Sequence, residues 1–385
     1  MKSMIKRLVL ASLLALSHLA SAYQPTPIEQ NTKAPDFELL GVDGKKHALK
    51  DFTGGRALVV IFTTNHCPDA IASFDRMIKL VDDFGDKGVK FVAINSNSPE
   101  GLHMEELGWT AYDDSYETMK LVSRDLGFNL PYLYDGDTQE VAKAYGAVAT
   151  PHVFVFDDEL KLKYNGRMDD ARRRLGPAEK NEARDAIAAV LAGKEPAITK
   201  TRPHGCGTKW KEKAGHVANM DQKWNDRPVT LAEVDVAGLK KLVANKGRTG
   251  LRLFNIWSTA CGPCIVEFPD LVDISRRYSW NEFEFIPISL DPVESKDKVL
   301  KFLEEKKCGL PARVAGMVKA DGRTTNNLIF KGDPEDLAEV LDPDWNGAQP
   351  HTVLVGAEGE VLFRHTGIID PLELRKKIVE QIWKQ

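Results

Sequence analysis

Cysteine is scarce in this chain: 385 residues contain only five cysteines, at positions 67, 206, 261, 264 and 308. That number is too small for a scaffold stapled by disulfides, and it is odd, so the cysteines cannot all pair within one chain. The scarcity indicates cysteines that react rather than cysteines that crosslink.

Long apolar runs are also missing after the first 22 residues, and we expect no membrane-spanning helix there. Residues 1–22 combine three cations with the apolar run LVLASLLALSHLA (8–20) and end on the small-residue site ASA, as a secretory signal peptide does. No cysteine follows that run to carry a lipid. We expect an exported protein, periplasmic or secreted, in a compartment where disulfides persist. An uncleaved membrane anchor is the alternative.

An excess of positive charge is absent too. Without the three cations of the signal peptide, the net charge moves from −4 to about −7, so nucleic acid is not expected as a partner. The chain is 43% hydrophobic and 28% charged, which is ordinary for globular proteins. Its length predicts two or three domains.

What is present is an internal repeat. Two apolar runs typical of buried strands each end in a cysteine, ALVVIFTTNHC (57–67) and GLRLFNIWSTAC (250–261), and helical spacing follows both. Each unit continues with a second strand, a hairpin that starts at a proline, and a closing helix. That order predicts two copies of one α/β fold, each with a mixed central sheet flanked by helices.

The repeat sets the expected domain boundaries: signal peptide 1–22, first domain 23–193, linker 194–228 and second domain 229–385. The linker is rich in Lys, Pro, Gly and Asn, shows little apolar periodicity, and contains the segment GCGTKW. Residues 308–346 are interpreted as an insertion in the second copy.

The most specific chemistry lies in CGPC, residues 261–264. A strand delivers Cys261 to a helix N-terminus, where free N–H groups and the helix dipole stabilise a thiolate. Cys264, one turn later, can attack a mixed disulfide at Cys261 and release the bound molecule. Haem attachment would need His at position 265, which is Ile, and zinc would need a second cysteine pair. We expect no metal and no other cofactor; a structural disulfide is the alternative.

Two further residues have candidate roles beside this motif. Glu267 lies three residues past Cys264 on the same helical face, where a buried carboxylate would have a raised pKa and could exchange protons with Cys264. A solvent-facing or capping glutamate is the alternative. Pro350 starts the strand that faces the cysteine loop, and a cis proline there would expose the preceding backbone edge to a substrate chain.

Residues 229–385 resemble the TlpA/ResA branch of exported thioredoxin-like thiol-disulfide oxidoreductases. The matching segments are NIWSTACGPC, the EFP that follows it and the hairpin AQPHTVLVGAEGEVLFRHTG. The resemblance implies a thioredoxin-like fold, so that the chain holds two tandem thioredoxin-like folds, and it implies a role for Glu267. It also implies protein thiols and disulfides as partners, and a membrane electron donor would fit as a further one.

Residues 33–195 resemble the redoxin superfamily of the AhpC/TSA type. Within it they are most similar to a peroxiredoxin-like subgroup with an NHCP loop and a GC-x-x-KW tail, here GCGTKW at 205–210. The resemblance implies that Thr64, three residues before Cys67, helps to bind a peroxide. Val60 stands where peroxiredoxins have a proline, and this departure weighs against a peroxidase.

Cys67 lacks a partner in its own turn, because position 70 is Ala. It also lies between a strand and a helix, so its thiolate should be favoured. Pro151 follows Cys67 by 84 residues, much as Pro350 follows Cys261 by 89. His66 would stabilise the thiolate if protonated. The loop also contains Asn65 and Asp69, and its polarity argues against burial; an inert buried cysteine is the alternative.

Cys206 is the best remaining partner for Cys67. The glycines on either side of it allow the close approach that a disulfide needs, with Cα atoms within about 7 Å. Our hypothesis is that Cys67 and Cys206 form a reversible disulfide that the Cys261–Cys264 dithiol resolves. Cys308 has no assigned role: a free thiol and a minor partner for Cys206 both stay open.

These observations favour an exported two-domain thiol-disulfide oxidoreductase that exchanges disulfides with protein substrates through Cys261 and Cys264. One alternative is an antioxidant thiol peroxidase at Cys67, with peroxide as its substrate and the fused dithiol as its reductant. The other is a non-catalytic first domain that binds a client protein.

Overall fold

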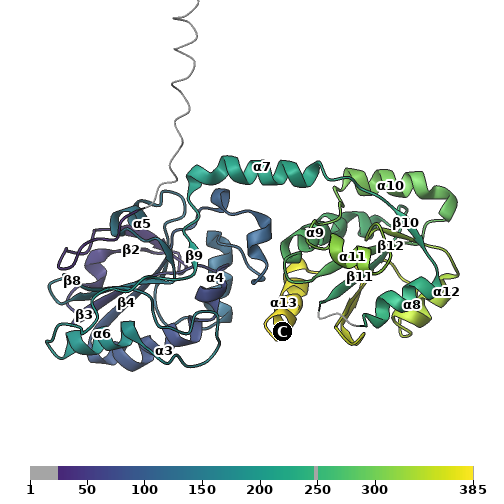
Figure 1. Cartoon of the computed structure of the whole chain (residues 1–385). Coiled ribbons are helices and arrows are strands. Elements are labelled where there is room, and N and C mark those ends of the chain that lie inside the picture. Colours follow the sequence, from purple (N-terminus) through teal and green to yellow (C-terminus); the bar gives the residue numbers. More distant parts are fainter. Residues whose placement is uncertain (1–24, 247–249, 385) are drawn as a thin grey trace, which may run out of the picture.

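A computed structural model of the chain describes residues 25–246 and 250–384; the predicted signal peptide lies outside them. The described residues form two α/β units, each built on a mixed sheet flanked by helices, with α7 (Ala214–Asn225) running between them (Figure 1). The predicted fold class is confirmed at this level. Within the described ranges, no helix is both long enough and apolar enough to cross a membrane.

The first unit has a seven-stranded sheet in the order β2-β1-β5-β4-β3-β7-β8. The central strand β3 is buried along its whole length, because its alternate side chains enter two apolar clusters on opposite faces of the sheet. The strands of this sheet are β1 (Glu38–Gly41), β2 (Lys46–Ala48), β3 (Ala57–Phe62), β4 (Val89–Asn95), β5 (Tyr132–Tyr134), β7 (His152–Asp157) and β8 (Leu162–Gly166).

The helices of the first unit cover both faces of this sheet. They are α2 (Pro68–Ile71), α3 (Phe74–Phe84), α4 (Tyr116–Asp125), α5 (Glu140–Tyr145) and α6 (Glu182–Leu191). The sequence predicted one helix after Cys67, but the structure has two. The backbone N–H and the hydroxyl of Ser73 both donate to the carbonyl of Ala70, and this local turn separates α2 from α3.

The second unit has a six-stranded sheet in the order β10-β13-β12-β11-β14-β15. Its strands are β10 (Ala232–Val234), β11 (Arg252–Trp257), β12 (Glu284–Ser289), β13 (Leu328–Phe330), β14 (His351–Val355) and β15 (Val361–Thr366). Its helices are α8 (Val236–Ala244), α9 (Gly262–Tyr278), α10 (Lys296–Glu305), α11 (Ala315–Ala320), α12 (Pro334–Leu341) and α13 (Pro371–Ile382). Residues 308–346, expected to be an insertion, supply β13 inside the sheet, so that expectation was wrong for this strand.

Five strands are arranged alike in the two sheets. The orders β5-β4-β3-β7-β8 and β13-β12-β11-β14-β15 have the same parallel and antiparallel relations. The register also agrees, because Phe62 pairs with His152 and Ile256 pairs with His351. Cys67 lies five residues after Phe62, and Cys261 lies five residues after Ile256. The two cysteines therefore occupy equivalent places.

The predicted linker is only partly a connection. Lys200 bridges to Asn165, and the short strand β9 (Cys206–Gly207) pairs antiparallel with β6 (Ala149–Thr150). Trp210 is buried in the first core. Residues 200–210 belong to the first unit because a sheet edge satisfies their backbone groups and the core takes up Trp210. The remaining connection is made mainly by α7.

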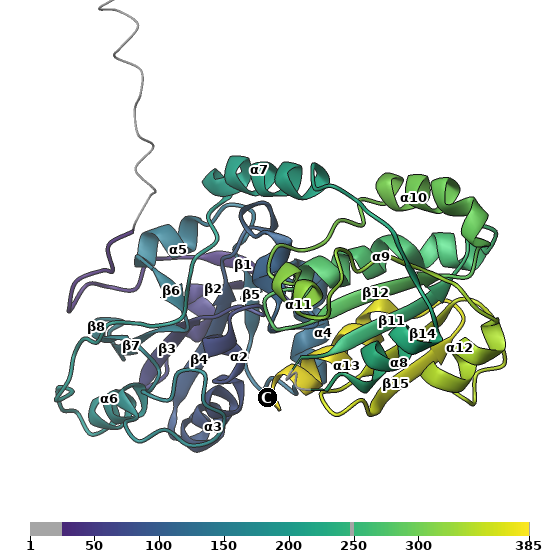
Figure 2. The same cartoon turned by 45° about the vertical axis from the view of Figure 1, so that its right-hand side comes forward.

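The two units meet at the segment between β4 and α4. The guanidinium of Arg277, at the end of α9, donates to the carbonyls of Leu107 (3.3 Å), Thr110 (3.2 Å) and Tyr112. Arg277 is only 5% exposed, so these hydrogen bonds are enclosed by protein. Helix α13 lies next to α4 in both views, where Lys376 pairs with Asp125 (Figure 2).

Candidate functional site

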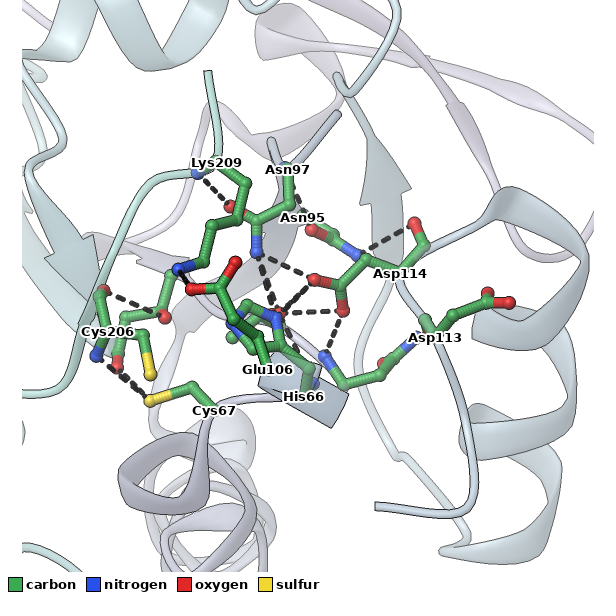
Figure 3. A network of polar contacts seen from close by, with 12 residues as sticks. His66, Cys67, Asn95, Asn97, Glu106, Asp113, Asp114, Cys206 and Lys209 are labelled. Carbon is green, nitrogen blue, oxygen red and sulfur yellow. Dashed lines mark hydrogen bonds and ion pairs between the residues drawn. The ribbon is translucent and has the colours of Figure 1, made fainter. Parts of the chain in front are cut away.

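Cys67 lies at the end of β3, immediately before α2, and is 0% exposed. Its Sγ accepts the backbone N–H of Cys206 at 3.1 Å (Figure 3). As a thiol it also donates to the carbonyl of Thr150, at 3.1 Å. The expectation that the polar loop would leave Cys67 unburied was wrong.

Cys206 reaches this position through the pairing of β9 with β6, which sets it opposite Thr150. Gly205 makes the approach close: a Cβ at this position would lie 2.0 Å from the carbonyl oxygen of Thr150, and its φ is +123°. The structure thus brings together the two cysteines that the sequence proposed as partners, here as free thiols. Cys308 lies elsewhere, in the core of the second unit, where its thiol donates to Asn327.

The surroundings of Cys67 favour its thiolate. Burial alone would raise the pKa of this thiol, but it is outweighed by hydrogen bonds from Cys206, the nearby charge of His66 and the N–H of Ala70. Together these lower the pKa of Cys67 to about 6. The bond to Cys67 and burial raise the pKa of Cys206. The pair therefore ionises at Cys67 first.

A buried carboxylate from a distant part of the sequence holds the cysteine loop in place through hydrogen bonds. Asp114, from the segment between β4 and α4, accepts hydrogen bonds from His66 Nδ1 (2.5 Å), Thr64 Oγ1 (2.6 Å), Asn97 Nδ2 (2.8 Å) and the Asn65 N–H (2.7 Å) (Figure 3). Burial would raise the pKa of Asp114, but the charge of His66 and these bonds keep it below its ordinary value. Asp114 is therefore ionised and holds His66 in the loop.

This network explains why the polar loop is buried. Asn65, His66 and Asp69 have at most 4% exposure, and Asn65 Nδ2, His66 Nδ1 and Asp69 Oδ2 are met by Asp113, Asp114 and Arg173 respectively. His66 Nε2 and Asp69 Oδ1 have no hydrogen-bond partner among the described residues. The hydroxyl of Thr64 donates to Asp114 in the same network. This hydrogen bond explains the presence of Thr64 without a role in peroxide binding. Sequence reasoning missed Asp114 and Asn97, because neither lies in a recognisable motif.

The second cysteine pair is joined by a disulfide between Cys261 and Cys264. Cys261 caps α9 and is half-buried, and its Sγ accepts the N–H of Cys264 at 3.2 Å. Cys264 is fully buried behind it. The exposed sulfur is thus at the end of a 17-residue helix, where the dipole and free N–H groups favour negative charge.

Glu267 is buried one helical turn beyond Cys264, with 2% exposure, which excludes the solvent-facing alternative. Its carboxylate accepts hydrogen bonds from Asn255 Nδ2 (2.9 Å) and from the N–H of Ile369 (3.1 Å). Burial raises the pKa of Glu267, although these two bonds act in the opposite direction. A carboxylate whose pKa is raised can take up and return a proton more readily than an exposed one.

The two prolines named by the sequence follow cis peptide bonds, Thr150–Pro151 and Gln349–Pro350. Their surroundings differ. The backbone edge before Pro151 is paired with β9, whereas within the described ranges Gln349 makes no backbone hydrogen bond. Among the residues that the structure describes, the free edge next to a cysteine loop belongs to the second unit.

Comparison with known proteins finds similarity to redox proteins. Residues 31–165 match the AhpC/TSA family. Thiol-disulfide oxidoreductase ResA from Geobacillus thermodenitrificans is 25% identical over 163 residues, which cover 42% of this chain and 83% of that protein.

One similar solved structure is an uncharacterized conserved protein from Geobacillus kaustophilus, which is 40% identical. The match covers 48% of this chain and 93% of that chain, with a TM-score of 0.43. A hypothetical protein from Sinorhizobium meliloti is 35% identical, with 49% and 97% covered and a TM-score of 0.43. A putative thiol:disulfide interchange protein DsbE from Chlorobium tepidum is 24% identical, with 43% and 99% covered and a TM-score of 0.33.

The chain is therefore similar to redox proteins of the thiol-disulfide oxidoreductase and redoxin class. Within it, residues 31–165 are an AhpC/TSA redoxin domain.

Proposed function

We propose that this protein is an exported thiol-disulfide oxidoreductase, periplasmic or secreted, with two tandem thioredoxin-like units, the first extending from residue 23 to include residues 200–210 and the second over 229–385. Its Cys261–Cys264 pair exchanges disulfides with protein substrates. The observation that carries the proposal is the geometry of that pair: a half-buried sulfur at the N-terminus of α9, with its bonded partner fully buried behind it.

The geometry supports a two-step exchange. The Cys261 thiolate attacks a substrate disulfide, forms a mixed disulfide and releases one substrate thiolate. Cys264 then gives its proton to Glu267 and attacks the Cys261 sulfur, which releases the second substrate thiolate and leaves the Cys261–Cys264 disulfide. Two electrons pass to the substrate. The same steps in reverse oxidise a substrate dithiol.

The surface around the pair supports a protein as the substrate. Ile265, Val266 and Ile368 are exposed apolar residues, and Val266 is 66% exposed. The first two directly follow Cys264, and Ile368 precedes the residue that donates to Glu267. With the free backbone edge at Gln349, these residues offer a substrate chain both apolar contacts and strand pairing.

The first unit carries the second part of the proposal, in which Cys67 and Cys206 form a reversible disulfide. The close approach of the Cys206 backbone to Cys67 and the lowered pKa of Cys67 support it. Cys67 is then the nucleophile and leaving group of the pair, and Cys206 is its resolving thiol.

Trapping distinguishes the roles of the two cysteines in the second unit. Cys264→Ser should accumulate mixed disulfides through Cys261, and Cys261→Ser should abolish insulin reduction. Cys308→Ser is the control, because Cys308 lies outside both pairs, and it should keep full activity. Full activity in Cys261→Ser would overturn the assignment. Peptide mapping of the oxidised protein should reveal a 67–206 crosslink, and the exported form should begin at residue 23.

A further inference from the structure

The backbone edge next to Cys67 is occupied by the chain itself. Strand β9 pairs there with β6, and Cys206 stands opposite Thr150. Protein substrates often bind by adding a strand to such an edge, so Cys206 takes the place that a substrate cysteine would take. Because Cys67 is 0% exposed, an outside protein cannot reach it while this pairing holds.

Cys206, by contrast, is half-buried and faces a cavity of about 220 Å³. The residues that line the cavity come from both units and include His66, His103, Trp109, Cys206, Trp280 and Asn281. A thiolate that enters this cavity comes next to Cys206, one of the residues that line it. Attack on the Cys206 sulfur expels Cys67, whose thiolate is left at the start of α2, where it accepts the backbone N–H of Cys206.

The dithiol of the same chain is far from this cavity. Trp280 and Asn281 follow directly after the C-terminal end of α9, whereas Cys261 caps its N-terminal end. A helix of 17 residues is about 25 Å long, and a disulfide requires Cα atoms within about 7 Å. The two thiol pairs of one chain therefore stand at opposite ends of α9.

The contact between the units opposes any movement that would bring Cys261 and Cys264 close to Cys206. Donors from α9 and α13, or from the residues next to these helices, bind backbone carbonyls over residues 107–112: Arg277, Tyr278, Asn281, Arg375 and Trp383. Separating the units would break all of these hydrogen bonds together, and their loss opposes the movement.

We propose that the two thiol pairs exchange electrons between two copies of the chain: the Cys261–Cys264 dithiol of one copy reduces the Cys67–Cys206 disulfide of another by attack on Cys206. This rests on the proposed function, which supplies both pairs. The donor Cys261 thiolate bonds to Cys206, the Cys67–Cys206 bond breaks, and Cys67 leaves as a thiolate. The donor Cys264 then loses its proton and attacks Cys261, and Cys206 leaves and takes up a proton. Two electrons pass, leaving a disulfide in the donor and a dithiol in the acceptor.

The test uses two full-length variants. The acceptor, Cys261→Ser/Cys264→Ser, is oxidised at 67 and 206; the donor, Cys67→Ser/Cys206→Ser, is reduced at 261 and 264. After mixing, acid quenching and alkylation followed by mass measurement count the acceptor thiols. We expect acceptor reduction at a rate that doubles when the donor concentration doubles. In the wild-type protein, the rate per molecule should rise in the same proportion.

Two donor controls check the route. A donor that also carries Cys264→Ser should be trapped in an interchain disulfide between its Cys261 and the acceptor's Cys206. A donor that also carries Cys261→Ser should reduce nothing. Circular dichroism establishes that each variant is folded before it is used.

Three results would overturn the inference. A wild-type rate per molecule that does not change with protein concentration, with no reduction in the mixture, would place the transfer within one chain and leave the proposed function intact. A trapped bond to Cys67 instead of Cys206 would contradict the point of attack. Failure of the acceptor to form a 67–206 disulfide before mixing would refute the proposed role of the first unit, and this inference with it.

Discussion

His66 Nδ1 lies 2.5 Å from Asp114 Oδ2, and the two side chains are 1% and 0% exposed. His66 directly precedes Cys67, and its charge favours the Cys67 thiolate. Asp114 therefore acts on Cys67 through His66. In the sequence, Asp114 comes shortly after residues 107–112, whose carbonyls accept hydrogen bonds from the second unit. One short segment therefore contacts both the thiol site and the second unit.

Replacing Asp114 by Asn should raise the pKa of Cys67 from about 6 toward the ordinary thiol value of about 8.5, because the loop would lose the carboxylate that holds His66 beside Cys67. The measurement is the ultraviolet absorbance of the thiolate against pH, in a Cys261→Ser/Cys264→Ser background. Loss of the buried pair should also cost about 3–5 kcal/mol of stability.

The matched control for this change is Asp113→Asn. The Asp113 side chain accepts from the N–H of Ser115 and the hydroxyl of Thr118 at the start of α4, and its bonds do not include His66. The control should leave the pKa of Cys67 where it is. An equal shift in both variants would mean that His66 does not connect Asp114 to Cys67.

Gly205→Ala should separate Cys206 from Cys67. The added Cβ would lie 2.0 Å from the carbonyl oxygen of Thr150, and the positive φ of +123° disfavours alanine. We expect less 67–206 crosslink after oxidation and a higher pKa for Cys67. Gly207→Ala is the control on the other side of Cys206, because its Cβ would meet only the carbonyl oxygen of Val148, at 3.8 Å. Equal crosslinking in the two variants would contradict the prediction.

Glu267→Gln should change the pH dependence of both reactivity and stability. Burial raises the pKa of Glu267, so the folded protein holds this proton more tightly than the unfolded chain does. Its contribution to stability is present at acid pH and is lost as the pH rises through the raised pKa, above about 4.5. The free energy of unfolding of the wild type, relative to the variant, should therefore fall over that range.

Urea unfolding at several pH values measures this difference, and alkylation of Cys261 in the reduced protein measures the reactivity profile. Glu373→Gln, an exposed glutamate on α13, serves as the control and should move neither curve. If Glu267→Gln leaves the thiol reactivity profile unchanged, Glu267 does not exchange protons with Cys264.

Arg277→Met should loosen the two units, because it removes three hydrogen bonds between them and leaves the Tyr112 carbonyl without its donor, at a cost of about 1–3 kcal/mol for that unsatisfied group. Small-angle X-ray scattering should give a larger radius of gyration, and proteolysis should become faster within residues 104–114. The control is Arg56→Met, which removes an exposed arginine that donates to the carbonyl of Leu191 inside the first unit. An unchanged radius for Arg277→Met would mean that other contacts hold the units together.

Local patterns in the sequence predicted the repeated frame of the fold. Buried strands such as β3 and β11, both hairpins and the closing helices follow from apolar runs and helical spacing, which need no distant partner. Asp114 was not predictable in this way. It lies 47 residues beyond Cys67 in a polar loop without periodicity, and it meets His66 only after the chain has returned along β4.

The burial of the polar cysteine loop was missed for the same reason. Side chains such as Asn65 read as exposed when only their neighbours in sequence are considered. They are buried here because carboxylate and carbonyl partners arrive from a segment about fifty residues away. Cys206 could be named by eliminating the other cysteines, but its pairing with Thr150 depends on a short strand that carries no sequence signal.

Helix α7 has a consequence for the choice of redox partner. The chain is anchored shortly before it, where the Lys209 N–H donates to Asn97 and Trp210 is buried, and again at its end, where Trp224 enters the second core. Its 12 residues thus form a stiff helical spacer about 18 Å long rather than a flexible tether. A flexible tether of similar length would keep the two thiol pairs at a millimolar effective concentration, whereas a tether that cannot span two sites reduces that concentration nearly to zero. The stiffness of α7 therefore leaves the dithiol free to react with other molecules.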